Sequence, residues 1–109
     1  MTLTWIDGQV NPQGTTDYKI LRVSGADGQS SVRITSLMYP AGTEMMFSIW
    51  WKANLATTAT LDILSETVTN VAIPATWTRY EKAVALPSGD VIDIIPANGA
   101  PDIYLCMAQ

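Results

Sequence analysis

An indole set among polar neighbours on one face of a predicted strand is the feature of this sequence best suited to binding chemistry. Residues 43–53 alternate, with four apolar side chains on one parity: Met45, Phe47, Ile49 and Trp51. The other parity carries Trp50 between Ser48 and Lys52. Because successive strand side chains point to opposite faces, this pattern predicts a strand with one face in a core. The opposite face then presents a ring that can hold a flat ligand.

Trp50 has two interpretations at this point. Its ring can stack on a sugar ring, whose axial C–H groups form an apolar patch, or it can pack beneath a loop or against another subunit. Arg33 and Tyr39 share a parity on a strand predicted over residues 31–39, and they would flank Trp50 if that strand lies in the same sheet. Lys52 and Tyr104 could complete such a surface with polar groups that match sugar hydroxyls. For these four flanking residues the alternative is an ordinary solvated strand face.

Four residues are predicted to support the fold rather than to bind a ligand: Trp51, Trp77, Arg79 and Tyr80. Trp77 and Tyr80 have opposite parities, so they cannot both face one ligand surface. Arg79 could pair with Glu81 or Asp62 across strands. Trp51 belongs to the apolar parity and is predicted to lie in the core.

Catalytic and metal chemistry is restricted by residue counts. The chain has no histidine and one cysteine, which excludes zinc sites built from Cys and His and triads that need a histidine. An intrachain disulfide is impossible, and Cys106 is predicted to be a small, inert buried residue. The aspartates lie mostly in turns, where they bond nearby backbone amides. No cofactor or metal is therefore predicted from the residues themselves.

A glycosidase needs two carboxyl groups about 5–10 Å apart across a cleft. Asp62 and Glu81 could approach one another, but nothing in the sequence predicts a cleft. We therefore expect a chain that is not an enzyme.

The length and the net charge of the chain limit its number of domains and the partners that it could bind. The 109 residues suffice for one domain, 1–109, in which 1–11 is either an edge strand or a tail. The net charge is −4, and the six basic residues do not cluster, so binding to nucleic acid is not expected. No apolar run approaches the ~20 residues of a membrane helix, and the first residues lack the regions of a signal peptide. Neither a nucleic acid nor a membrane is expected as a partner.

The elements that would position these residues are strands. Turn residues recur at the spacing typical of a sandwich or barrel, and no long stretch has helical periodicity. The predicted strands cover 18–24, 31–39, 43–53, 58–64, 67–73, 77–86, 91–95 and 103–108, with a hairpin around Ser65 and Glu66. About eight strands in two antiparallel sheets is the count of a jelly roll, so we predict an all-β sandwich of that type.

Several short motifs also resemble a known family. They are Phe-Ser-Ile-Trp-Trp-Lys-Ala at 47–53, Thr-Trp-Thr-Arg-Tyr at 76–80 and Ile-Tyr-Leu-Cys-Met-Ala-Gln at 103–109. In this order they resemble the carbohydrate-binding-module-like jelly rolls of bacteriophage tail, fibre and neck proteins. The similarity covers most of residues 12–109. The chain departs from the family pattern at Met45, Met46 and Cys106.

The resemblance implies a non-catalytic accessory module of a phage virion that binds host-surface glycans, with the virion surface or the extracellular space as its location. The alternative is a structural domain that decorates or joins virion parts and binds no sugar. Members of the family include domains with a calcium ion between the first and last strands, for which Asp17 and Asp102 are the only candidates in this chain. Glycans or other virion proteins are the expected partners, and a homo-oligomer is compatible with the low charge. The ending at Gln109 suggests a piece of a longer protein.

Overall fold

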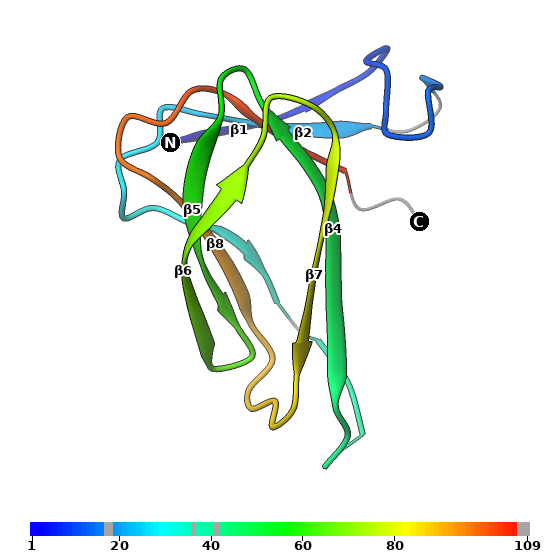
Figure 1. Ribbon diagram of the computed structural model, residues 1–109, viewed down its shortest axis with the longest axis vertical. Coiled ribbons are helices and arrows are strands. Elements are labelled where there is room, and N and C mark those ends of the chain that lie inside the picture. The colour runs from blue at the N-terminus through cyan, green and yellow to red at the C-terminus, as the bar shows by residue number, and fades with distance from the viewer. Residues whose placement is uncertain (17–18, 36, 41, 107–109) are drawn as a thin grey trace.

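The computed structural model describes residues 1–16, 19–35, 37–40 and 42–106 and consists of two antiparallel β-sheets (Figure 1). The five-stranded sheet contains, in spatial order, β1 (Thr2–Ile6), β2 (Ile20–Ser24), β9 (Ile103–Cys106), β4 (Met45–Ala53) and β7 (Thr78–Val84). The four-stranded sheet contains β3 (Val32–Ile34), β8 (Ile92–Pro96), β5 (Thr57–Ile63) and β6 (Glu66–Ile73). None of the described residues lies in a helix, so this part of the chain has no helical segment able to cross a membrane.

The predicted fold class, an all-β sandwich of two antiparallel sheets, is confirmed. The structure has nine strands rather than about eight. The additional strand is β1, at the position predicted to be an edge strand or a tail. It pairs with β2 over five registered positions, from Thr2 opposite Ser24 to Ile6 opposite Ile20.

Several strands are shorter in the structure than the sequence predicts, β3 most of all. The strand expected over 31–39 is only β3, because the chain beyond Ile34 leaves the ladder. The Leu37 amide instead donates to the Asp90 carbonyl in the loop that precedes β8, at 3.2 Å. Likewise, β7 ends at Val84 rather than at Leu86. Residues 107 and 108 of the last predicted strand lie outside the described residues.

The predicted hairpin joins β5 to β6 with its turn one residue earlier than expected. Leu64 and Ser65 both have positive φ angles, 50° and 75°, which is the backbone of a two-residue type I′ turn. Within β6, Asn70 also has a positive φ of 55°, and the register with β5 shifts at this point between Ala59 and Leu61. The shift marks a β-bulge. Asn70 can adopt the left-handed conformation there because its short polar side chain tolerates it better than most.

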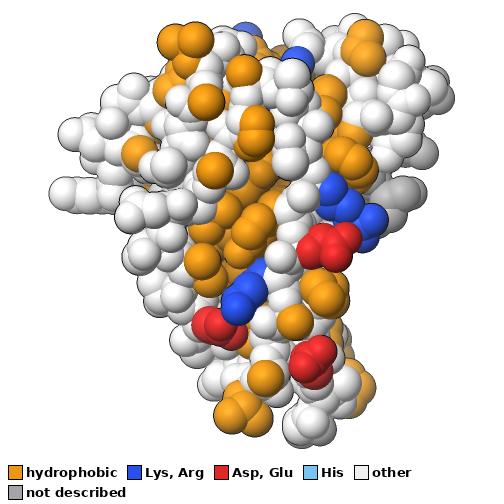
Figure 2. All heavy atoms as spheres, in the orientation of Figure 1, with side chains coloured by type: hydrophobic (Ala, Val, Ile, Leu, Met, Phe, Trp, Pro, Cys, Tyr) orange, Lys and Arg blue, Asp and Glu red, His pale blue; other side chains and the backbone are white. Residues whose placement is uncertain are grey.

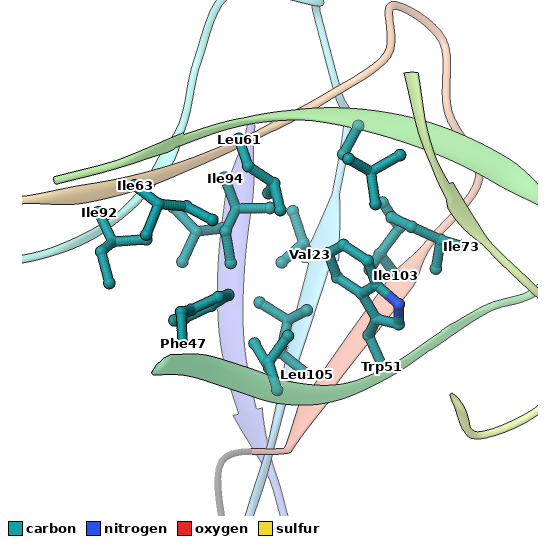
Figure 3. Packing of buried hydrophobic residues seen from close by; sticks show 14 of the residues in the cluster. Val23, Phe47, Trp51, Leu61, Ile63, Ile73, Ile92, Ile94, Ile103 and Leu105 are labelled. Carbon is teal, nitrogen blue, oxygen red and sulfur yellow. The ribbon is translucent and has the colours of Figure 1, made fainter. Parts of the chain in front are cut away.

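The core lies between the sheets and is built from alternate residues of both. Figure 3 shows Phe47, Trp51 and Leu105 pointing from the five-stranded sheet toward Leu61, Ile63 and Ile94 of the other. Trp51 is the largest side chain that is fully buried, with 1% of its surface exposed. The odd-numbered residues of β4 therefore face the core, as the alternating pattern predicts.

The edges of the two sheets meet along a seam between β6 and β7, and this seam is not fully closed. Figure 2 shows apolar side chains running down this face of the molecule, with charged side chains of both signs lying together at its margins. Tyr80 packs on Trp51 with ring centroids 5.2 Å apart, and burial raises the pKa of its phenol. Lys82 of β7 binds Glu66 of β6 at 2.9 Å, and this hydrogen bond raises the pKa of the lysine. An inward-pointing charge on an edge strand also disfavours pairing with another chain.

The buried position of Trp51 gives a direct test of the fold. We expect Trp51→Ala to lower the free energy of unfolding by about 3–5 kcal/mol, because it removes a large side chain from a closed core. The matched control is Trp5→Ala, since Trp5 is 65% exposed and should change stability by no more than about 0.5 kcal/mol. Urea unfolding monitored by circular dichroism measures both, and similar losses in the two variants would contradict the assignment.

Candidate functional site

The outer face of the five-stranded sheet gathers aromatic and basic side chains from three parts of the sequence. Trp50 of β4 lies opposite Cys106 of β9 on one side and Arg79 of β7 on the other. Two residues further along β4, Lys52 lies opposite Tyr104. Since Trp51 faces the core, Trp50 and Lys52 must face outward. Both are half-buried, so part of each side chain is open to solvent.

Lys52 holds two aromatic rings around its ammonium group. Its Nζ lies 5.2 Å from the centroid of the Trp77 ring and 5.3 Å from that of the Tyr104 ring. Both distances are within the range of a cation–π contact. The arrangement places Trp77 and Tyr104 on the same face as Trp50, and we refer to these three rings together with Lys52 as the aromatic face.

One wall of the aromatic face is formed by the segment between β1 and β2. The indole N–H of Trp77 donates to the Val10 carbonyl at 3.0 Å. The adjacent Asn11 is 1% exposed, and its side chain accepts from the amides of Gln13 and Thr15 at 3.0 and 3.1 Å. It also donates to the Thr15 hydroxyl at 2.9 Å. A buried amide with this many local partners fixes the loop, so the orientation of Trp77 is set by both ends of its hydrogen bond.

Two arginines flank the aromatic face and differ in their surroundings. Arg79 binds Glu81 at 2.9 Å, one of the two partners expected for it, although the pair lies within β7 rather than across strands. Arg22 of β2 lies opposite Tyr104, and its Nε is buried without a hydrogen-bond partner among the described residues. Arg22 was not among the sequence candidates. Its signal was present, since it is the one charge in the strand Ile-Leu-Arg-Val-Ser at 20–24.

Two predicted members of the candidate surface do not join it. Arg33 and Tyr39 would flank Trp50 only if their strand lay in the same sheet, but β3 belongs to the four-stranded sheet. The expectation that they flank Trp50 is therefore wrong. The physical reason is that β3 pairs with β8, a contact between residues about 60 positions apart that strand patterning does not reveal. Trp50, Lys52 and Tyr104 do lie together, and their role in binding stays a prediction.

Both of these displaced residues have partners of their own. Arg33 binds Asp93 with two hydrogen bonds of 2.8 and 2.9 Å. These bonds hold the pKa of the Asp93 carboxyl below its usual value, helped by a bond from the Ser31 hydroxyl, and they raise the pKa of Arg33. The Tyr39 hydroxyl donates to the Gly89 carbonyl at 2.6 Å.

The four residues predicted as scaffold separate into two pairs. Trp51 and Tyr80 lie on the inner side of the five-stranded sheet and contact each other, in agreement with that expectation. Trp77 and Arg79 lie on the outer side with Trp50. Strand parity separates Trp77 from Tyr80, as the structure confirms, but it does not say which of them faces outward. Trp77 precedes β7 rather than lying in it, so its position depends on the Val10 contact more than on strand alternation.

The acidic residues form no catalytic or metal arrangement in the described part of the chain. Asp62 of β5 and Glu81 of β7 lie on different sheets, and both alternate with inward-facing residues. They therefore point away from each other, and the idea that they approach is wrong. No group of three or more Cys, Asp or Glu residues within the described ranges could hold a metal ion. Of the two calcium candidates, Asp17 lies outside those ranges. Asp102 belongs to the segment before β9, where its carbonyl accepts from the Asn54 amide at 3.0 Å.

Cys106 is a free, buried cysteine, as predicted. A separate apolar pocket of about 250 Å³ lies where β4 begins and β5 ends. Its lining includes Met45, Met46 and Leu37. Met46 is 58% exposed and Met38, next to Leu37, is 94% exposed, so large apolar side chains surround this end of the sandwich.

Comparisons with known proteins identify the fold. No protein-family model and none of the curated proteins searched matches the chain. Among solved structures, it is similar to the N-terminal CBM22-1–GH10 modules of endo-1,4-β-D-xylanase 10B from Clostridium thermocellum, complexed with xylohexaose. The TM-score is 0.63 and the sequence identity 15%, over 99% of this chain and 25% of that one. The chain has the β-sandwich fold of a carbohydrate-binding module. It spans about a quarter of the length of the protein it matches.

The Arg33–Asp93 pair predicts a specific pH dependence of stability. The folded-state pKa of Asp93 lies below its unfolded value of about 3.9, so the pair stabilises the fold above that pH and is lost as the pH falls through the folded pKa. Asp93→Asn should therefore lower the urea midpoint at about pH 7. The difference in urea midpoint between the wild type and the variant should become smaller as the pH falls below about 4. A difference in urea midpoint that stays constant down to about pH 2.5 would show that the bonds from Arg33 do not lower the pKa of Asp93.

Proposed function

We propose that this chain is a non-catalytic module that binds glycans on the aromatic face. The observation that carries the proposal is that the Trp77 and Tyr104 rings lie around Lys52, and that Trp50 lies on the same sheet face. Each ring is half-buried, so it is held in place yet keeps a surface open to a ligand. A sugar ring stacks on Trp50, and polar groups beside it bind the hydroxyls.

The likeness of fold to a module solved with a xylo-oligosaccharide supports this proposal as an analogy. The rings of this chain make the argument specific, since a fold by itself does not determine a function. Arg33 is left out of the proposed site because it belongs to the other sheet and binds Asp93 there, and Tyr39 because it lies after β3 and binds Gly89. Trp77 joins Trp50, Lys52 and Tyr104 in it.

We further propose that the module serves a phage virion, displayed on its surface, and recognises glycans of the host. The support for this is the resemblance of the motifs at 47–53, 76–80 and 103–109 to phage jelly rolls. A single face of this size binds sugars weakly, and many copies on one particle raise the avidity without any new contact.

A second candidate function has its own observation. The pocket of about 250 Å³ and the exposed Met38 and Met46 favour a structural domain that joins virion parts, because methionine is enriched in protein interfaces. In that case the pocket end of the sandwich, rather than the aromatic face, makes the contact.

A glycan array with the native chain and Trp50→Ala separates the two functions. We expect the native chain to bind a subset of glycans and Trp50→Ala to bind them about tenfold or more weakly, as for the loss of a central aromatic contact. Trp5→Ala is the matched control. Trp5, on the edge strand β1, is paired with the inward-facing Leu21 of β2, so its side chain is on the opposite side of the sheet from Trp50. Equal binding by native chain and Trp50→Ala would refute the stacking role. Absence of binding to every glycan would favour the structural function.

A further inference from the structure

The two basic side chains on either side of Tyr104, Arg22 and Lys52, have no carboxylate partner among the described residues. Arg33, Arg79 and Lys82 each form an ion pair with an acidic residue, at 2.8 to 2.9 Å. Within the described ranges, the other three basic residues, Lys19, Arg22 and Lys52, form none. The chain has ten acidic and six basic residues, so carboxylates are in excess and could have paired with them. Arg22 and Lys52 flank the same ring, that of Tyr104.

The positions of these two cations follow from the strand register. Arg22 lies opposite Tyr104 on one side, and Lys52 lies opposite Tyr104 on the other. Adjacent strands are about 4.8 Å apart, so the two Cα atoms are separated by roughly 10 Å across the tyrosine. Long side chains cross that distance easily, and Lys52 Nζ already lies 5.3 Å from the Tyr104 ring. Both positive groups can therefore reach one ligand group held above Tyr104.

The guanidinium of Arg22 gives a second indication that a ligand group binds here. Its Nε is buried and has no acceptor among the residues that the structure describes, and a buried donor without a partner costs free energy that a native structure rarely leaves uncompensated. A guanidinium binds a carboxylate through two parallel N–H···O bonds, so a carboxylate from a ligand would supply the missing acceptor after a small rotation of the side chain.

We propose that the glycan bound on the aromatic face is acidic, and that its carboxylate binds Arg22 and Lys52 above Tyr104. This inference rests on the proposed function and names its ligand class as a saccharide containing uronic or another carboxylated sugar. The rings take the apolar faces of the sugar units, and the two cations take the charge. A free inorganic anion could bind the two cations but would not stack on the rings of Trp50 and Trp77.

The charge of the whole chain does not oppose this assignment. The net charge of −4 repels an anion weakly at physiological salt, where exposed charges more than about 8 Å away are largely screened. The row of residues that contains the two cations is Thr4, Arg22, Tyr104, Lys52 across four strands, with Trp77 beside Lys52. None of these is acidic. The charged residues of this row, Arg22 and Lys52, are therefore both positive.

The test compares a polysaccharide with its own uncharged form. Polygalacturonate, alginate, hyaluronan and glucuronoxylan are each offered intact and after reduction of their carboxyl groups to alcohols, beside neutral glycans and single-stranded DNA. Affinity electrophoresis or calorimetry measures binding. We expect at least one intact acidic polymer to bind about tenfold or more tightly than its reduced form, and its binding to weaken as salt is raised.

Two variants assign this preference to the residues. Arg22→Met and Lys52→Gln should each remove most of the difference between intact and reduced polymer, while Lys82→Gln, the matched control, should leave it unchanged because Lys82 lies at the seam with Glu66. Arg22→Met keeps the apolar stem of the side chain and removes the unpaired donor. Its melting temperature should therefore equal or exceed that of the native chain, whereas a purely structural arginine would lower it.

The outcomes separate this inference from the function on which it rests. Neutral and reduced glycans bound as tightly as acidic ones, with loss in Trp50→Ala, would overturn the acidic ligand and leave glycan binding in place. Binding to no glycan at all would overturn both. Tighter binding to single-stranded DNA than to any acidic glycan would also overturn the assignment, because stacking rings and cations would then serve a nucleic acid.

Discussion

The strict alternation of β4 between core and solvent is the constraint on which the rest of the structure depends. Because side chains on a strand repeat every two residues, burial of Trp51 forces Trp50 outward, and a shift of one residue would exchange them. Trp51 is held by the core and by Tyr80. The register that buries Trp51 in the core therefore also determines that Trp50 faces outward, with Lys52 beside it on the same face.

Strands β2 and β9, together with Trp77, extend the outward face of β4 into a wider surface. Strand β9 places Tyr104 beside Lys52, and β2 places Arg22 beyond Tyr104. Trp77 comes from outside the ladder, and its hydrogen bond to Val10 ties the segment between β1 and β2 to the same face. Strands that are remote in sequence meet here because the sandwich order β1-β2-β9-β4-β7 brings them side by side. The binding proposal thus depends on long-range pairing as much as on the aromatic residues themselves.

Local patterning predicted much of the fold and part of the site. The alternation at 43–53 gave the correct inward and outward residues of β4, and the turn residues gave the β5–β6 hairpin to within one position. Sheet membership could not be predicted in this way, since the pairing of β3 with β8 depends on residues far apart in sequence, and so Arg33 was placed on the wrong face. Arg22 was missed because one charge in a short strand resembles an ordinary solvated residue. Trp77 was assigned to the scaffold because strand parity says little about a residue just before a strand.

Contact between a saccharide and the outer face of the five-stranded sheet can be measured directly through the four tryptophans of the chain. Each indole N–H gives its own signal in a ¹H–¹⁵N spectrum, which can be followed as an oligosaccharide of a bound glycan is added. We predict that the signals of Trp50 and Trp77 move, while those of the buried Trp51 and of Trp5 stay in place. Movement confined to Trp5, or a saccharide that binds and leaves Trp50 unmoved, would contradict this prediction.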